Sequence, residues 1–372
     1  MKILVLSCST GEGHNSAAKA VGEYFEKCGI EYEIADTLSL VSPSVSQTAS
    51  DIYVFTTRTS MFEFLYSAGK MVSSPKLKSP VYLTNKLYCK KLLSYIEDNG
   101  FDTVICVHLF PAEAISALKN AGKLSSCRTI FIFTDYTCIP FMEETHLDYY
   151  VMPHEHLIEE CVQNGMRREK LYPIGIPVRQ AFYTKQPKDQ SRIECNRLIG
   201  KTMDVTKKWF LVMSGSMGYG NLKDLVSQIV SKCRDSVELL LVCGNNTKLK
   251  EDLEKDYADV ASVRILGFVN YVPLLMDACD VLFTKPGGLS STEAAAKNIP
   301  MIHTTPIPGC ETRNAEFFHY HGMSYSTQDV KEQVDMALKI CSEPERFGKM
   351  TRSQRENINY NACEQILDLC KR

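Results

Sequence analysis

The sequence predicts an α/β protein of two domains, each built on a parallel β-sheet with helices on both faces. Short, continuously apolar segments alternate with amphipathic helical patterns along most of the 372 residues. This alternation is typical of parallel sheets that are buried on both sides. It stops in a polar stretch, roughly Val178 to Asp204, and then starts again. A chain of this length also exceeds the usual size of one hydrophobic core.

In the first half, the expected strands are KILVLS, DTVICVH, TIFIFTD and DYYVMP. The helical pattern after the first strand places Ala17, Val21 and Phe25 on one face. Pro111 stands at the start of the next helical segment, where a missing backbone N–H is tolerated. Residues 1–180 are therefore predicted to form a Rossmann-like domain.

The second half repeats the pattern with the expected strands WFLVMSG, VELLLVCG, VRILGF, DVLFTK and PMIHTT. Residues 200–343 are predicted to form a second Rossmann-like domain, its sheet facing the first across a cleft. The helical residues 344–372 either close the second domain or pack back on the first.

Composition and charge exclude several classes of protein. The formal net charge of −2 gives no reason to expect a nucleic-acid partner. The 15 cysteines are scattered without any Cys-x-x-Cys pair, which predicts reduced thiols and a reducing compartment. The N-terminal apolar run is too short for a signal peptide, and no segment approaches the roughly 18 apolar residues that span a bilayer. We expect a cytoplasmic protein that can lie on a membrane.

Residues 51–95 fit the alternation poorly, because aromatic side chains are interleaved with basic ones. The acidic residues of this stretch are Asp51 and Glu63. One explanation is an insertion whose aromatics pack on the core. The other is an interfacial segment with aromatics at the acyl boundary and cations on anionic head groups, which the charge balance favours. The residues concerned are Tyr53, Phe55, Phe62, Phe64, Tyr66, Tyr82 and Tyr88 with Arg58, Lys70, Lys76, Lys78, Lys86, Lys90 and Lys91.

The turns after the strands carry the candidate ligand contacts, because ligands of open α/β sheets bind past the carboxyl ends of the strands. SGSMGYGNL has the glycines of a phosphate turn but no Walker lysine, and a tight strand–helix turn explains it equally well. In FTKPGGLSSTE, Glu293 either binds a ribose or complements the helix dipole. In PIPGCETRN, the polar residues either hold sugar hydroxyls or cap a helix.

Three titratable groups are predicted to gather at one edge of the first sheet. His14 follows the first strand, and His108 and Asp135 each end a later strand. A lone example of such a residue is more often a buried, hydrogen-bonded polar group. Together the three raise the chance that this edge lines a site.

These motifs together resemble a family of glycolipid glycosyltransferases. STGEGHNSAAKAV, TDYTCIP, YPIGIPVR, LLLVCGNNTKLKE, ILGFVNYVPLLMDACDVLFTKPGGLSSTEAAAKNIPMI and PIPGCETRNAEFF occur in this order. The chain resembles the monogalactosyldiacylglycerol synthases and the bacterial processive diacylglycerol glucosyltransferases of glycosyltransferase family 28. It is more distantly similar to the N-acetylglucosaminyltransferase that makes lipid II. The resemblance implies a GT-B fold, with the lipid acceptor on the first domain and UDP-sugar on the second.

The resemblance also implies roles for individual residues. His14 would lie at the reaction centre with Asp135, and Gly13 and His108 would lie beside the acceptor. Glu293 would hold the ribose, and Phe268 and Val269 the uracil. The remaining UDP-sugar positions implied are Ser214, Gly215, Ser216, Met217, Gly218, Asn246, Gly287, Gly288, Ser290, Thr292, Gly309, Glu311 and Asn314.

An inverting transfer needs a base for the acceptor hydroxyl and positive character beside the departing UDP. Plant members have an aspartate where Ser9 stands, so His14 or Asp135 is the expected base here. The sequence has no Asp-x-Asp motif, which predicts transfer without a metal or other cofactor. Cys310 and Asn245 depart from residues frequent in the family and leave the donor sugar, glucose or galactose, open.

The leading expectation is thus a 1,2-diacylglycerol 3-beta-glycosyltransferase bound peripherally to the cytoplasmic face of an anionic membrane. A UDP-sugar 2-epimerase shares the fold but has no use for a membrane-binding segment. A non-catalytic UDP-sugar sensor that binds a partner protein is the third alternative.

Overall fold

The structure is a computed structural model that describes residues 1–8, 12–41, 79–200, 202–213 and 222–372. Most of the aromatic and basic stretch predicted between residues 51 and 95 lies outside the described residues. The chain divides into two compact units. Unit 1 comprises Met1–Gln180, Pro308–Cys310 and Asn359–Arg372, and unit 2 comprises Ala181–Ile307 and Glu311–Ile358.

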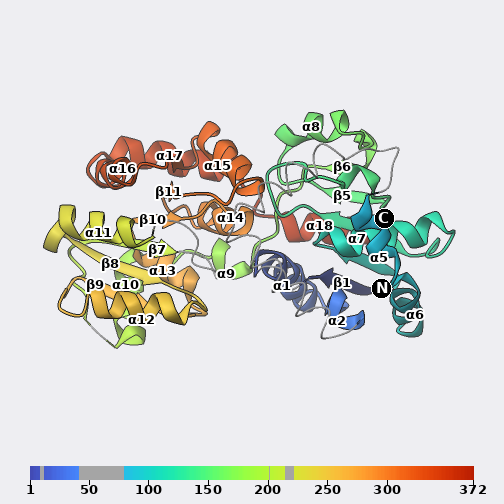
Figure 1. The fold of residues 1–372 in the computed structure, drawn as a ribbon, viewed down its shortest axis with the longest axis horizontal. Coiled ribbons are helices and arrows are strands. Elements are labelled where there is room, and N and C mark those ends of the chain that lie inside the picture. The colour runs from blue at the N-terminus through green and yellow to red at the C-terminus, as the bar shows by residue number, and fades with distance from the viewer. Residues whose placement is uncertain (9–11, 42–78, 201, 214–221) are drawn as a thin grey trace. The chain divides into compact units, whose positions relative to one another are not determined.

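The described part of unit 1 contains a sheet of six parallel strands in the order β2-β1-β3-β4-β5-β6 (Figure 1). Its strands are β1 (Lys2–Ser7), β2 (Glu31–Asp36), β3 (Thr103–Cys106), β4 (Arg128–Ile132), β5 (Tyr149–Val151) and β6 (Leu171–Tyr172). Its helices are α1 (Glu12–Lys27), α2 (Thr37–Val41), α5 (Pro80–Lys86), α6 (Cys89–Asp98), α7 (Leu109–Asn120), α8 (Ile158–Gln163) and α18 (Ala362–Lys371).

Unit 2 contains a second sheet of six parallel strands among its described residues, in the doubly wound order β12-β11-β10-β7-β8-β9. Its strands are β7 (Lys208–Met213), β8 (Val237–Val242), β9 (Val263–Leu266), β10 (Val281–Thr284), β11 (Met301–His303) and β12 (Tyr325–Ser326). The helices are α9 (Gln180–Tyr183), α10 (Lys188–Ile199), α11 (Leu222–Cys233), α12 (Thr247–Asp256), α13 (Val272–Ala278), α14 (Gly288–Ala296), α15 (Cys310–Tyr320), α16 (Val330–Ser342) and α17 (Pro344–Asn357).

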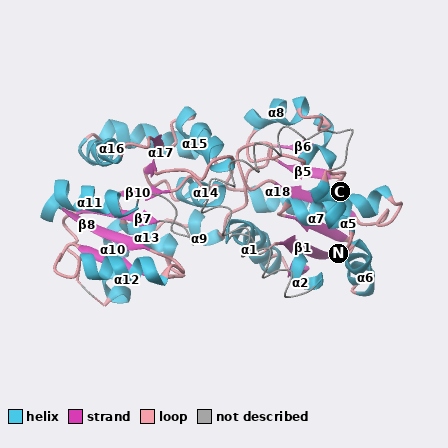
Figure 2. Cartoon of the chain, viewed as in Figure 1, coloured by secondary structure: helices cyan, strands magenta, loops and turns pink. Residues whose placement is uncertain are grey.

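The predicted α/β class with two parallel sheets is confirmed (Figure 2). In each sheet the strand order reverses at one point, and ligands of such sheets bind beyond the carboxyl ends of the strands there. In unit 1 the reversal lies between β1 and β3, where Leu6 pairs with Cys106. In unit 2 it lies between β7 and β10, where Met213 pairs with Thr284. The residues after these four strand ends are therefore expected to lie at the centre of any site, with residues after the neighbouring strands beside them.

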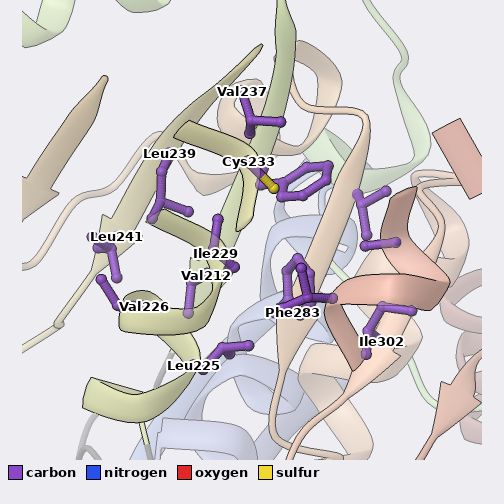
Figure 3. Packing of buried hydrophobic residues seen from close by; sticks show 14 of the residues in the cluster. Val212, Leu225, Val226, Ile229, Cys233, Val237, Leu239, Leu241, Phe283 and Ile302 are labelled. Atoms are coloured by element: carbon purple, nitrogen blue, oxygen red, sulfur yellow. The ribbon is translucent and has the colours of Figure 1, made fainter. Parts of the chain in front are cut away.

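One face of the second sheet packs on α11 and α16 in a continuous apolar core (Figure 3). Phe283 and Ile302 from the strands belong to this cluster together with Ile229 and Cys233 from α11, and each of these side chains is buried. The rings of Phe210 and Phe283 lie 5.5 Å apart, centre to centre. This packing holds the central strands rigidly and so fixes the positions of the turns that follow them.

The polar stretch predicted as a boundary contains α10, which contacts α13 within unit 2. One buried ion pair and one hydrogen bond from a second ion pair attach this stretch to the unit. The Arg192 guanidinium donates to Asp280 at 2.6 Å, and it lies over the ring of Trp209. Lys297 and Asp277, each 2 % exposed, are joined at 2.6 Å, and the Lys297 ammonium also donates to the Thr184 carbonyl. Removing one partner of such a pair leaves a buried charge uncompensated.

The last helix of the chain, α18, packs on α1 in unit 1 although all of unit 2 intervenes in the sequence. Ile366 is fully buried there, and the Cys363 thiol lies 3.6 Å from the Ala20 carbonyl oxygen. Arg128, at the start of β4, donates to the Cys370 carbonyl at 2.5 Å. The helix before it, α17, instead contacts α14 and α16 in unit 2.

Ile366→Ala is expected to lower the free energy of unfolding of unit 1 by about 2 to 4 kcal/mol, because it removes a fully buried side chain. Glu364→Ala, an exposed change on the same helix, should alter it by less than about 0.5 kcal/mol. Denaturant unfolding followed by circular dichroism measures both. Equal effects of the two changes would show that α18 contributes no core to unit 1.

Candidate functional site

His14 lies in the first turn of α1, directly beyond the carboxyl end of β1, with Gly13 beside it. Its Nδ1 lies 2.7 Å from the carbonyl oxygen of Val107, the residue that follows β3. Thr134 Oγ1, after β4, lies 3.2 Å from the same nitrogen. A carbonyl oxygen can only accept, so Nδ1 of His14 carries a proton and donates it. In the neutral ring this leaves the lone pair on Nε2.

His108 caps the N-terminus of α7, and its ring lies against that of His14. The two ring centres are 4.6 Å apart in an edge-to-face arrangement. His108 Nδ1 accepts a hydrogen bond from the backbone N–H of Phe110 at 3.1 Å. Nδ1 therefore has no proton, and in the neutral ring the proton is on Nε2. The two histidines thus hold their protons on opposite nitrogens.

Both rings are kept neutral near pH 7. Burial lowers the pKa of His14 below its ordinary value, and the Asp135 carboxylate and the Val107 carbonyl oppose this change. Burial lowers the pKa of His108 well below its ordinary value, and the neighbouring His14 adds to the effect. Asp135 is thus close enough to His14 to favour its imidazolium. The predicted grouping of these three side chains at one edge is confirmed.

This arrangement suits the handling of one hydroxyl group. His14 has a lone pair on Nε2, while His108 has its proton on Nε2, so a proton acceptor and an N–H group stand side by side, as handling a hydroxyl requires. A general base works best when it is neutral at the working pH. Asp135 would stabilise the positive charge that His14 acquires.

The corresponding edge of unit 2 is built around the turn between β10 and α14. Lys285 follows β10 directly and forms an ion pair with Glu311, in which both side chains are mostly buried. The second carboxylate oxygen of Glu311 accepts the Ile307 N–H at 2.8 Å. A side chain added at Gly287 would meet Glu311 at 3.8 Å, so this glycine, Lys285 and Glu311 lie close together. The N-terminus of α14 therefore has a lysine beside it.

Several predicted sugar-nucleotide positions make contacts within unit 2. Asn314 is fully buried and donates to the Pro286 carbonyl at 3.0 Å. The Thr292 hydroxyl donates to the Gly288 carbonyl at 2.6 Å within α14. Glu293 is 8 % exposed, and Ser290, one helical turn before it, is half-buried.

Asn246, Phe268 and Val269 follow other strands of the same sheet, whereas Gly309 belongs to the short segment Pro308–Cys310 of unit 1. Asn246 caps α12, its side chain accepting the Leu249 N–H at 3.0 Å. Phe268, after β9, is 68 % exposed, and Val269 beside it is half-buried. Gly309 has a φ of +104°, a conformation that favours glycine. The predicted diphosphate turn, Ser214, Gly215, Ser216, Met217 and Gly218, lies outside the described residues.

Three further residues at these edges were not predicted. Lys285 stands directly before the predicted pair of glycines, and the signal for it was a charge placed at the end of an apolar strand. Thr134 stands next to Asp135, where a hydroxyl after a strand gave a weaker signal. Val107 contributes only its carbonyl, so its side chain gave no signal.

Within the described ranges, no helix is both long and apolar enough to cross a bilayer. The same residues contain no cluster of three or more His, Cys, Asp or Glu side chains arranged to hold a metal ion.

Sequence comparisons identify two families along the chain. Residues 14–178 match the family Monogalactosyldiacylglycerol (MGDG) synthase, and residues 199–357 match Glycosyl transferases group 1. The processive diacylglycerol beta-glucosyltransferase of Bacillus licheniformis is 27% identical over 374 residues, which covers 98% of this chain and 93% of that protein. The Bacillus subtilis protein of the same name is 26% identical, with 99% and 94% covered.

The fold is similar to that of solved glycosyltransferase structures. Acinetobacter baumannii MurG has a TM-score of 0.65 at 14% identity, with 100% of this chain and 99% of that chain covered. At these identities the likeness concerns the fold alone, and it is that of a GT-B protein.

The ring of His14 is expected to titrate below its ordinary pKa of about 6.5. Asp135→Asn should lower this pKa further, because the carboxylate favours the imidazolium. Side-chain NMR between pH 4.5 and 8 measures both values. His303 is an internal reference, since burial lowers its pKa to about 3 and its signals should stay constant over that range. A His14 midpoint at or above 6.5 would contradict the expected burial.

Proposed function

We propose that this glycosyltransferase, in which residues 14–178 form a monogalactosyldiacylglycerol synthase domain and residues 199–357 a glycosyl transferases group 1 domain, moves a hexose from a UDP-sugar to diacylglycerol. The product is a membrane glycolipid with a 3-β linkage. The full-length likeness to diacylglycerol beta-glucosyltransferases supports this substrate pair. The observation that carries the chemistry is the pair of neutral histidines with opposite proton positions at the edge of unit 1.

In the proposed reaction, His14 is the base and His108 orients the acceptor. The acceptor hydroxyl gives its proton to Nε2 of His14 while its oxygen attacks the anomeric carbon of the sugar. The new C–O bond forms as the bond to UDP breaks, and UDP leaves with the electron pair. Because attack is from the face opposite UDP, the configuration inverts. The Asp135 carboxylate, which favours the imidazolium of His14, stabilises the protonated base.

We assign the UDP-sugar to the carboxyl edge of unit 2. The free N–H groups at the start of α14 and the Lys285 ammonium beside them supply positive character for the diphosphate. The exposed Phe268 ring is proposed to lie against uracil, and Glu293 to bind the ribose. These groups support transfer without a metal or other cofactor, in agreement with the lack of an Asp-x-Asp motif.

In the described end of the aromatic and basic stretch, Tyr82 and Tyr88 are buried, so these two aromatics pack on the core and do not lie at an acyl boundary. Contact with an anionic membrane is supported here by exposed leucines and lysines instead. On α5 and directly after it, Leu83 is 56% exposed and Leu87 is 84% exposed. The exposed Lys86 directly precedes Leu87 in the sequence, and the exposed Lys90 follows it by three residues. Exposed leucines flanked by lysines fit the boundary between acyl chains and anionic head groups. Peripheral binding to the cytoplasmic face of a membrane is proposed on this basis.

The proposal predicts that radiolabel from UDP-glucose or UDP-galactose enters a glycolipid in liposomes of diacylglycerol and anionic lipid, with EDTA present. The donor that labels the lipid identifies the hexose. Interconversion of the UDP-sugar without any lipid product would instead indicate the epimerase, which shares the fold. UDP binding with neither reaction would indicate the sensor.

His14→Ala is expected to reduce transfer by about 10²- to 10⁴-fold, the usual contribution of a general base, while UDP affinity stays unchanged. Glu293→Ala should instead act mainly on binding, so that the affinity for UDP falls before the transfer step itself is affected. Transfer rates and calorimetric titration with UDP separate the two. A folded His14→Ala protein that no longer binds UDP would overturn the assignment of the base.

The double variant Leu83→Ser/Leu87→Ser is expected to bind anionic vesicles more weakly, because it removes apolar surface at the proposed contact. Ile193→Ser, which removes a 65 % exposed apolar side chain from α10, is the matched control and should bind normally. Vesicle flotation measures both. Equal binding of all three proteins would place the membrane contact elsewhere.

A further inference from the structure

A chain of buried and partly buried contacts joins the segment between α5 and α6 to the histidine pair. It begins at Tyr88, the residue before α6, whose side chain is 8% exposed. The Tyr88 hydroxyl lies 2.8 Å from Asn85 Oδ1 and 3.1 Å from the carbonyl oxygen of Phe110. Phe110 belongs to the first turn of α7, two residues after His108.

The orientation of the Tyr88 hydroxyl is fixed by its neighbours. Asn85 donates through Nδ2 to the buried Glu113 carboxylate at 2.5 Å, so its Oδ1 is the atom left to face Tyr88. Both partners of Tyr88 are then acceptors, so its hydroxyl is the donor and shares its one proton between Asn85 Oδ1 and the Phe110 carbonyl. Burial raises the pKa of Tyr88 well above its ordinary value, which keeps that proton in place.

The contacts continue from Phe110 to His14. The Phe110 N–H donates to His108 Nδ1, and the Phe110 ring lies edge-to-face on the His108 ring with centres 4.6 Å apart. The His108 ring in turn lies 4.6 Å from that of His14. A shift of Phe110 would therefore move His108 relative to His14.

We propose that Tyr88 is a positioning residue for the transfer reaction: its hydroxyl holds Phe110, and through Phe110 it holds His108 against His14. The inference rests on the proposed function. Leu87 and Tyr88 are consecutive, and one is 84% exposed whereas the other is 8% exposed. The segment that presents Leu87 to the proposed membrane surface is thus the segment that supports the histidine pair from inside.

Tyr88→Phe tests the proposal, because it removes only the hydroxyl. We expect kcat to fall about tenfold, since small displacements of reacting groups are costly, while UDP affinity stays unchanged. Without the hydroxyl, Phe110 and His108 should pack less tightly against His14. His14 is then less buried, so its pKa, which burial lowers, should rise. The acidic limb of the kcat profile should then move to higher pH, towards the ordinary histidine value.

Tyr82→Phe is the matched control. Tyr82 is a buried tyrosine on α5 whose hydroxyl accepts a hydrogen bond from Asn120, at the far end of α7, at 3.3 Å. It should leave both kcat and the pH profile unchanged. If Tyr88→Phe behaves like Tyr82→Phe in both measurements, the positioning role is wrong.

NMR titration of His14 in both variants gives a readout that needs no turnover. The pKa should rise in Tyr88→Phe and stay constant in Tyr82→Phe even if the wild-type protein transfers no sugar to diacylglycerol. If the pKa of His14 stays constant in both variants, Tyr88 does not position the histidine pair. Should Tyr88→Phe fail to fold, Phe110→Leu removes the ring contact with His108, and the same rise is expected.

Discussion

The hydrogen bond from His14 Nδ1 to the Val107 carbonyl joins the helix after β1 to the chain after β3, across the point where the strand order reverses. It sets which nitrogen of His14 has the lone pair. The bond from Phe110 N–H to His108 sets the opposite proton position there. Both depend on strand ends held in register by buried apolar side chains, as Leu6 and Cys106 are. The chemistry at this edge is therefore a consequence of main-chain geometry.

Unit 2 uses a different arrangement at the equivalent edge. There the charged groups are already paired, since Lys285 binds Glu311 and Glu311 also accepts a backbone N–H. A diphosphate approaching the start of α14 would compete with Glu311 for the lysine. Unit 1 thus offers neutral groups suited to proton transfer, whereas unit 2 offers the N-terminus of α14 and a lysine that an anion would have to take from Glu311.

The central strands and the gathering of His14, His108 and Asp135 could be predicted from sequence, because apolar periodicity identifies buried parallel strands and their carboxyl ends share one edge. The edge strands β2, β6 and β12 were missed, since they are short or partly exposed and lack a continuous apolar run. The proton positions could not, since they depend on carbonyl and N–H groups that every residue has. For Asn314 and Thr292 the residue type suggested ligand contact, whereas the structure shows the partners Pro286 and Gly288. The partner of a hydrogen-bonding side chain is set by the tertiary structure, and residue type alone does not determine it.

The return of α18 to α1 means that unit 1 is not continuous in sequence. During synthesis α18 leaves the ribosome only after the whole of unit 2 has been made. Until then unit 1 is incomplete, and the apolar surface that Ile366 covers is exposed to solvent. A nascent chain interrupted anywhere within unit 2 would carry that uncovered apolar surface. Chaperones and proteases could thereby distinguish an unfinished chain from a finished one.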